Sequence, residues 1–235
     1  MKITDMREGM AQKELHIFYL LDTSGSMGGA PIASLNDAMR DTVNAMGDIR
    51  AKADLKLGIM TYDTEARWVT GGQNNLENVD DFVWNDVEAG GMTFLGEALG
   101  LLKAGLSRNT MMASETGNNV PIIIFMTDGM PNDNWEAALK EIRENKWYQA
   151  ATKIGIALGE SADVKVLSEL VGDPEAILRT NDLQQFKKLL RVVSVTSTLV
   201  GSRSTVTTNG QTGADIVRAV EEKVEDKDFD DDDLV

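Results

Sequence analysis

Two short runs of almost continuous apolar residues most constrain how this chain can fold. They are LHIFYLLD at residues 15–22 and VPIIIFMTD at residues 120–128. A strand with apolar side chains on both faces has to be covered on both faces, which is typical of a central strand in a parallel sheet. Each run ends in an aspartate, Asp22 and Asp128. We therefore expect two buried strands whose carboxyl ends carry acidic groups.

Strand patterns alternate with helical patterns along most of the chain. Besides the two apolar runs, strands are expected at 54–63, 66–70, 152–159 and 175–180, the first two of these joined as a hairpin. Helices are expected from Pro31, from about Thr93, and over 133–145, 161–171 and 182–196. This alternation predicts an α/β fold: a doubly wound, mostly parallel six-stranded sheet with one antiparallel edge strand and helices on both faces.

The chain divides by composition into three parts. We expect an N-terminal extension at 1–14, one domain at 15–198, and a segment at 199–235 made of a polar linker, a short helix and an acidic tail. Residues 221–235 hold nine acidic residues and two lysines, so they carry −7 of the formal net charge of −15. Such a tail either keeps the protein soluble or offers a carboxylate to the chain's own site or to a neighbouring copy, as a route to self-association.

Composition excludes several classes of function. A net charge of −15 disfavours nucleic acid and anionic membranes as main partners, because both repel an acidic surface. The chain has no cysteine and one histidine, His16, which excludes thiolate and multi-histidine metal sites. The first fourteen residues lack the apolar core of a signal peptide, and no apolar run is long enough to span a bilayer, so a cytoplasmic protein is expected.

Oxygen-bearing side chains gather at the predicted carboxyl ends of the strands. In open α/β sheets, ligands bind at that edge. The candidate residues there are Asp22, Ser24, Ser26, Thr93 and Asp128. Hydroxyls and carboxylates without nitrogen or sulfur suit a hard divalent cation, with Mg²⁺ first and Ca²⁺ or Mn²⁺ as alternatives. For Asp22 and Ser24 alone, an ordinary Asx turn is an equally simple interpretation.

Three segments, in this order, resemble a known family. DTSGSM at 22–27 resembles the Asp-x-Ser-x-Ser sequence of the metal-ion-dependent adhesion site (MIDAS) of von Willebrand factor A (VWA) domains. GGMTFLGEAL resembles the family's threonine-bearing segment, and IIIFMTDGMPND resembles its strand-terminal Asp-Gly. The resemblance covers roughly residues 14–198 and implies the Rossmann-like VWA fold. The closing segments look most like the bacterial tellurite-resistance branch of the TerY type.

The resemblance also implies a function and a division of roles. Ser24, Ser26 and Thr93 would contact the metal directly, while Asp22 and Asp128 would act through water or hydrogen bonds. One metal position would stay open for an acidic side chain of a protein partner. The implied role is a metal-dependent protein–protein interaction module, not an enzyme, with tellurite or other chemical stress, or a related defence, as its setting.

Catalytic alternatives match the sequence less well. No lysine follows SMGGAP as a P-loop requires, and Asp22 stands where a nucleophile elbow needs glycine. A haloacid-dehalogenase-like phosphatase also places an aspartate at the end of its first strand, but Ser24 occupies the position of its second aspartate. A VWA subunit of a chelatase or AAA-type assembly is the remaining alternative, with the ATPase on a separate chain.

Residues beside the predicted ligands form a second set of candidates. Met27, Met92, Phe94 and Met130 either form an apolar rim for a partner or turn back into the core. Asn132, Asp133 and Asn134 are best explained by helix capping, with Asp133 and Glu136 in a capping-box pattern at the start of the helix over 133–145. His16 begins the first strand, at the opposite end from the site, and is interpreted as structural.

Overall fold

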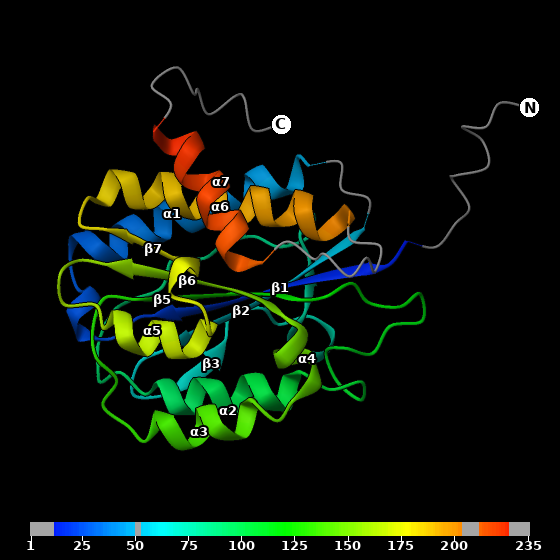
Figure 1. Cartoon of the computed structure of the whole chain (residues 1–235), viewed down its shortest axis with the longest axis horizontal. Coiled ribbons are helices and arrows are strands. Elements are labelled where there is room, and N and C mark those ends of the chain that lie inside the picture. Colours follow the sequence, from blue (N-terminus) through cyan, green and yellow to red (C-terminus); the bar gives the residue numbers. More distant parts are fainter. Residues whose placement is uncertain (1–11, 50–52, 204–211, 226–235) are drawn as a thin grey trace, which may run out of the picture.

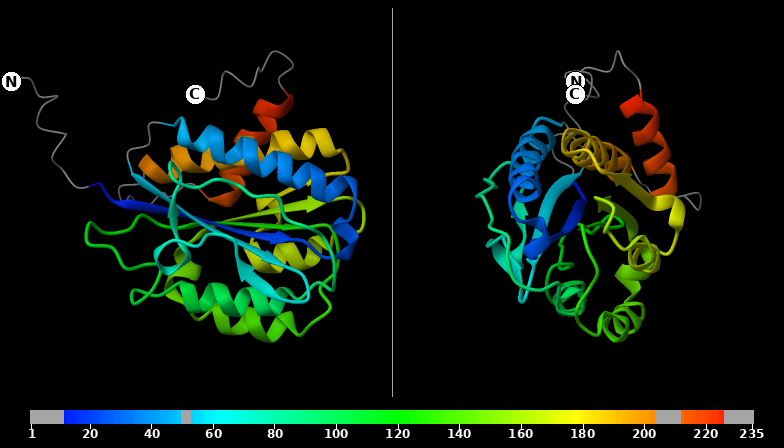
Figure 2. Two further views of the ribbon diagram at one scale, coloured as in Figure 1. Left: turned by 180° about the vertical axis from the view of Figure 1, so that it is seen from behind. Right: turned by 90° about the vertical axis from the view of Figure 1, so that its left-hand side faces the viewer.

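A single sheet lies between two layers of helices (Figure 1). This computed structural model describes residues 12–49, 53–203 and 212–225. The helices α1, α6 and α7 cover one face of the sheet, and α2, α3, α4 and α5 lie on the other (Figure 2 gives two further views). No helix in the described part of the chain is long and apolar enough to cross a membrane.

The elements follow the predicted alternation of strands and helices. The strands are β1 (Glu14–Asp22), β2 (Asp54–Tyr62), β3 (Ala66–Trp68), β4 (Glu77–Asn78), β5 (Ile122–Thr127), β6 (Thr152–Leu158) and β7 (Ile177–Thr180). The helices are α1 (Ala30–Gly47), α2 (Leu95–Gly105), α3 (Trp135–Ile142), α4 (Lys146–Ala150), α5 (Val164–Val171), α6 (Leu183–Arg203) and α7 (Gly213–Glu225). Short 3-10 turns lie at Gly25–Met27, Gln73–Asn75 and Pro174–Ala176.

The strand order is β3-β2-β1-β5-β6-β7, with β3 antiparallel to β2 and the other pairs on this path parallel. This confirms the predicted α/β fold, including the antiparallel hairpin partner at the edge. A short second partner that was not predicted, β4, also pairs antiparallel with β2. Because β1 lies between β2 and β5, the two apolar runs are neighbours and their carboxyl ends share one edge of the sheet.

Side chains of β1 enter two separate cores in alternation. Ile17, Tyr19 and Leu21 pack among the helices α1 and α6, and Phe18 and Leu20 pack on the side of α2. Successive side chains of a strand point to opposite faces, so a central strand needs apolar residues on both faces. That requirement explains why the two apolar runs locate the middle of the sheet.

The segment before α2 forms part of the core without regular secondary structure. Phe82 and Trp84 are buried in the stretch between β4 and α2, which forms no helix or strand. Asn36 of α1 holds this stretch: its side chain accepts hydrogen bonds from the Val87 N–H (2.9 Å) and the Trp84 indole (3.2 Å), and donates one to the Val87 carbonyl (2.9 Å). A backbone without regular secondary structure can pack in this way because a buried amide side chain satisfies some of its polar groups.

The C-terminal helices add to one side of the sheet. The helix α6 extends to Arg203, seven residues beyond the predicted end at 196. The helix α7 packs against α6 and β6, and its Ile216, Val217 and Val220 are buried. The polar linker and most of the acidic tail, at 204–211 and 226–235, lie outside the described residues.

His16 is a buried histidine at the start of β1, at the opposite end of the strand from Asp22. Neither ring nitrogen has a hydrogen-bond partner within the described structure, and the ring stacks on Phe18. Glu14 places Oε2 3.4 Å from Nε2, and Lys56 lies beside His16 on β2. Burial, together with the positive charge of Lys56, lowers the pKa of His16 from 6.5 to about 4. The ring is therefore neutral at pH 7.

The shifted pKa of His16 predicts a loss of stability in mild acid. Between pH 6.5 and 4 the unfolded state binds a proton that the folded state does not, so the free energy of unfolding falls as the pH falls. The pKa shift corresponds to about 2 kcal/mol lost between pH 7.5 and pH 5. Denaturant unfolding of the wild type and His16→Leu at both pH values measures this, and the loss should be smaller in the variant by that amount. Equal losses in the two proteins would contradict the prediction.

Candidate metal centre

Asp22 joins the ends of the two central strands. It is the last residue of β1 and is fully buried. Its Oδ1 accepts a hydrogen bond from the Ser24 N–H (2.9 Å), and its Oδ2 accepts one from the Thr127 hydroxyl at the end of β5 (2.6 Å). The bond to Ser24 is the Asx-turn contact that the sequence allowed. The same turn directs the backbone so that two serine hydroxyls follow Asp22 at the sheet edge.

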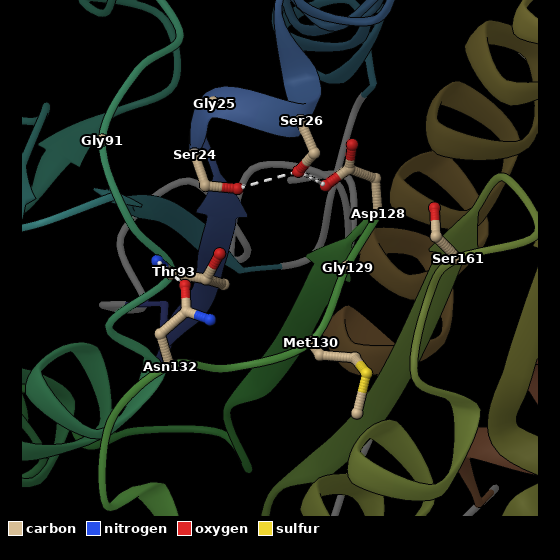
Figure 3. Close-up of a pocket in the computed structure, with 10 residues that line it drawn as sticks. All are labelled: Ser24, Gly25, Ser26, Gly91, Thr93, Asp128, Gly129, Met130, Asn132 and Ser161. Atoms are coloured by element: carbon tan, nitrogen blue, oxygen red, sulfur yellow. Dashed lines mark hydrogen bonds between the residues drawn. The ribbon is translucent and has the colours of Figure 1, made fainter.

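The two serine hydroxyls and Asp128 form a continuous row of oxygens (Figure 3). Ser24 Oγ lies 3.1 Å from Ser26 Oγ, and the Ser26 hydroxyl donates to Asp128 Oδ1 at 2.7 Å. Ser24 is buried, and Ser26 is exposed in the middle of the 3-10 turn Gly25–Met27. The first and last members of this row come from sequence positions more than 100 residues apart, brought together because β1 and β5 are adjacent.

Thr93 reaches the same pocket from the loop before α2. Its backbone N–H donates to the Asn132 side-chain oxygen (2.9 Å), and its carbonyl accepts from the Asn132 N–H (2.9 Å). The loop is also joined to the serine turn, because the Gly25 N–H donates to the Gly91 carbonyl at 3.2 Å. Thr93 is buried, and Figure 3 shows it beside Asn132.

These groups surround one open pocket of about 340 Å³. Its lining residues are Ser24, Gly25, Ser26, Gly91, Thr93, Asp128, Gly129, Met130, Asn132 and Ser161 (Figure 3). Four of the five predicted ligands line it, and Asp22 lies behind Ser24, where its oxygens accept hydrogen bonds from other groups. The structure therefore places all five predicted residues at one edge of the sheet.

Burial makes both aspartates of the pocket costly to ionise. It raises the pKa of Asp22, which hydrogen bonds from Ser24 and Thr127 partly counteract and the charge of Asp128 raises further. Burial also raises the pKa of Asp128, against the hydrogen bond from Ser26. Two carboxylates held close together without a basic partner in any of their hydrogen bonds favour a bound cation.

The donor set fits a hard divalent cation. The side-chain oxygens that line the pocket are the four hydroxyls of Ser24, Ser26, Thr93 and Ser161, the Asp128 carboxylate and the Asn132 amide, with the Asp22 carboxylate behind them. Within the described residues, no three of histidine, cysteine, aspartate and glutamate come together as a metal-binding group. A cation here would depend on neutral hydroxyls and on water for much of its coordination, as Mg²⁺ readily does because it retains several of its waters.

The structure divides the predicted apolar rim. Of the two alternatives for Met27, rim or core, the structure shows the core: Met27 is fully buried because the 3-10 turn directs its side chain inward beside α1, so it is not part of the rim. Met92 and Met130 are exposed, at 49% and 64%, and Phe94 is half-buried. Within the described residues only two other large apolar side chains, Val83 and Val120, are exposed. Two methionines on different loops thus remain as the exposed apolar residues beside the predicted ligands.

Helix capping explains the residues after Met130 only in part. The residue before α3 is Asn134, whose side chain makes no capping hydrogen bond, so the predicted capping box of Asp133 and Glu136 is wrong. Asp133 instead accepts a hydrogen bond from the Glu97 N–H in α2 (3.2 Å). Sequence reasoning also missed the roles of Thr127 and Ser161. Thr127 precedes Asp128 directly, which was the one available indication, and nothing local identified Ser161.

Comparison with known proteins identifies the family. The model of the von Willebrand factor type A domain family matches residues 16–192. No curated protein sequence matches the chain. Similar solved structures include a von Willebrand factor type A protein from Catenulispora acidiphila, 16% identical with a TM-score of 0.62, covering 80% of this chain and 43% of that one.

Two further structures broaden the comparison. Proximal thread matrix protein 1 from the mussel byssus, with a zinc-occupied MIDAS motif, is 19% identical with a TM-score of 0.56 and covers 78% of this chain and 48% of its own. The ArnB paralog VWA2 from Sulfolobus acidocaldarius is 18% identical with a TM-score of 0.57, at 77% and 45% coverage. These similarities concern the fold, and this chain spans less than half the length of each of the three proteins.

Proposed function

This chain belongs to the von Willebrand factor type A domain family, and from that premise we propose that it binds a protein partner through a divalent metal ion. Domains of this family are commonly metal-dependent interaction modules. The main support for the proposal is that four oxygen-bearing side chains line one pocket: Ser24, Ser26, Thr93 and Asp128. Asp22, at the end of β1, connects this pocket to the sheet through its hydrogen bonds with Ser24 and Thr127.

We assign the residues as follows. Ser24, Ser26 and Thr93 are the direct oxygen ligands, and Asp22 and Asp128 act through water or through their hydrogen bonds to the hydroxyls. Mg²⁺ is the expected ion, with Mn²⁺ and Ca²⁺ as alternatives, and zinc is included because the mussel protein carries it in its MIDAS motif. When bound, the ion supplies positive charge at the open face of the pocket, where a partner's carboxylate can coordinate it.

The exposed methionines define the surroundings of that carboxylate. Met130 lines the pocket and Met92 precedes Thr93, so apolar groups stand on the two loops that also carry proposed ligands. Methionine side chains adapt to different apolar surfaces. We therefore propose a partner that presents an acidic side chain with apolar residues beside it.

The position of Asp22 favours binding over phosphoryl transfer. A phosphatase of the haloacid-dehalogenase type would need this aspartate as a nucleophile, accessible to its substrate. Asp22 is fully buried, and both of its carboxylate oxygens accept hydrogen bonds. A nucleophile needs a free, directed oxygen in contact with the substrate. The role of subunit in a chelatase or AAA-type assembly is compatible with the same site, since it also depends on binding a partner.

The cellular setting rests on the sequence resemblance alone. We propose a cytoplasmic role in tellurite or related chemical stress from the likeness of the closing segments to the tellurite-resistance branch.

In the second interpretation of the acidic tail, a tail carboxylate binds the site of its own or another copy. Residues 226–235 of the tail lie outside the described structure. Sedimentation of the full chain and of a truncation ending at 220, with Mg²⁺ and with EDTA, tests the tail directly.

Metal-dependent capture tests the proposed function. Calorimetric titration of the purified chain with Mg²⁺, Mn²⁺ and Zn²⁺ should show one site, and tagged protein should retain a partner from an extract of the native cell that EDTA releases. Asp22→Ala should fail to retain it. Met92→Ser combined with Met130→Ser should bind metal as the wild type does but retain less partner. A wild-type chain that binds none of the three ions would overturn the proposal.

A further inference from the structure

Two residues outside the proposed ligand set join the two loops that form the pocket. Asn132 and Asp133 lie in the loop between Asp128 and α3. Asn132 contacts Thr93, and Asp133 contacts the first turn of α2. Thr93 and Asn132 exchange a reciprocal pair of hydrogen bonds, each 2.9 Å long. Asp133 Oδ2 accepts from the Glu97 N–H (3.2 Å). We call Asn132 and Asp133 together the loop clamp.

The loop clamp supplies a cap that α2 lacks locally. The residue before α2 is Phe94, which has no side chain able to accept a hydrogen bond from the first turn. The first N–H groups of a helix need acceptors from elsewhere. Asp133 provides one from a different element, and its negative charge lies at the positive end of the helix dipole. The start of α2, two residues after Thr93, is thereby tied to the loop that follows Asp128.

Close packing at Gly96 shows how tightly the two loops meet. A Cβ atom added at Gly96 would lie 2.8 Å from Asp133 Oδ2, 3.1 Å from the Trp135 Cα and 3.3 Å from the Asn134 carbonyl oxygen. Two of these atoms belong to the backbone, so a side chain at Gly96 would have to displace the 134–135 segment. The absence of a side chain lets the loop approach closely enough for Asp133 to reach the α2 amides.

In this position, only one of the two carboxylate oxygens of Asp133 is hydrogen-bonded to a described residue. Oδ1 of Asp133 is buried and has no hydrogen-bond partner within the described structure. Burial raises the pKa of Asp133, although the hydrogen bonds from Gly96 and Glu97 oppose that rise. A buried carboxylate oxygen without a partner is unfavourable for folding. Its retention is consistent with a position that serves the adjacent pocket.

We propose that Asn132 and Asp133 are positioning residues of the metal site, which hold Thr93 at the correct distance from Ser24, Ser26 and Asp128. The inference rests on the proposed metal-binding function. Outer groups that hold metal ligands in place typically affect metal affinity by about 10- to 100-fold. In the described structure, the hydrogen bonds that join the Thr93 backbone to the loop after Asp128 are the two with Asn132.

The test compares matched substitutions by calorimetric titration with Mn²⁺. Asn132→Ala removes the acceptor for the Thr93 N–H and should weaken Mn²⁺ binding about tenfold. Asn132→Asp keeps an acceptor oxygen at the same place and should bind at least as tightly as the wild type. Asn134→Ala is the control, because Asn134 is exposed and makes no capping hydrogen bond. It should leave Mn²⁺ affinity unchanged.

A second pair of variants tests the same joint without touching its hydrogen-bonding side chains. Gly96→Ala should weaken Mn²⁺ binding, because it displaces the loop clamp. Gly100→Ala on the same helix should not, because a Cβ there meets nothing within 4 Å. This pair decides the question if Asn132→Ala does not fold.

The outcomes separate the inference from the function on which it rests. A wild-type chain that binds no Mn²⁺, Mg²⁺ or Zn²⁺ overturns the proposed function itself. A wild type that binds metal while Asn132→Ala and Gly96→Ala bind it equally well overturns only the positioning role. Equal weakening by Asn132→Ala and Asn132→Asp also overturns it, because the acceptor oxygen would then be irrelevant. Melting temperatures in EDTA show whether any loss is merely one of stability.

Discussion

Replacing Asp22 with asparagine is expected to weaken divalent-metal binding by about 100-fold without unfolding the protein. Asparagine can still accept the Ser24 N–H through its oxygen, and its amide can donate to the Thr127 hydroxyl, whose own hydrogen can turn to the Gly129 carbonyl 3.4 Å away. The hydrogen-bond pattern therefore survives while one negative charge behind the ligands disappears. Calorimetric titration with Mg²⁺ and Mn²⁺ measures the change in affinity.

Thermal melting provides an independent measurement for the same variant. A ligand that binds only the folded state raises the melting temperature, so Mg²⁺ should stabilise the wild type and not Asp22→Asn. In EDTA the variant should melt at or slightly above the wild-type temperature, since it no longer buries a charged group. Asp54→Asn is the matched control: it removes the same charge at the opposite end of the sheet, where the Asp54 side chain is 62% exposed. Wild-type affinity in Asp22→Asn would place the metal elsewhere.

Replacing Gly91 with alanine is expected to lower the free energy of unfolding by about 3 kcal/mol. Gly91 has φ of +74°, a backbone conformation that residues with a side chain rarely adopt. A Cβ at this position would also lie 2.3 Å from the Thr64 hydroxyl oxygen and 3.2 Å from the Thr64 backbone nitrogen. The Thr64 hydroxyl accepts the Met92 N–H at 3.0 Å, so the substitution would disturb the Thr93 loop as well.

A substitution at Gly90 distinguishes the effect of the Gly91 conformation from a general loss of backbone flexibility in this loop. A Cβ at Gly90 meets nothing within 4 Å, and Gly90 does not have a positive φ. Gly90→Ala should therefore change the free energy of unfolding by less than about 0.5 kcal/mol in denaturant melts, whereas Gly91→Ala should show the large loss. Similar values for the two variants would contradict the role given to the Gly91 conformation and to its contact with Thr64.

Much of the fold could be predicted because its central strands carry an unusually simple pattern. A strand buried on both faces is apolar at almost every position, which distinguishes β1 and β5 from strands with one face in water. Helix boundaries were less accurate: α6 continues to Arg203, beyond the predicted end at 196, through a run of hydroxyl-bearing residues whose polarity had suggested an end to the helix. Ser194 accepts from the Tyr19 hydroxyl and itself donates to the Leu190 carbonyl, so a polar residue could be buried inside the helix.

The proposed ligands could be predicted for a related reason. Asp22 and Asp128 are marked by their places at the ends of apolar strands, and parallel strands bring such ends to one edge. Their partners could not be found in this way. Asn132 and Asp133 have the local sequence of helix-capping residues, and the pattern favoured capping of the helix that follows them. Which helix Asp133 caps depends on how closely two loops pack, and Gly96 determines that distance.

The sequence by itself determined the α/β alternation, the central position of β1 and β5, and the chemistry of the oxygen-rich edge. These follow from side-chain periodicity and residue type, which are local properties. Only the tertiary structure decided that Met27 is buried while Met92 and Met130 are exposed, and that Asn132 and Asp133 join the Thr93 loop to the Asp128 loop. Those outcomes depend on contacts between segments far apart in the chain, where backbone geometry and close packing select among partners that are equally plausible locally.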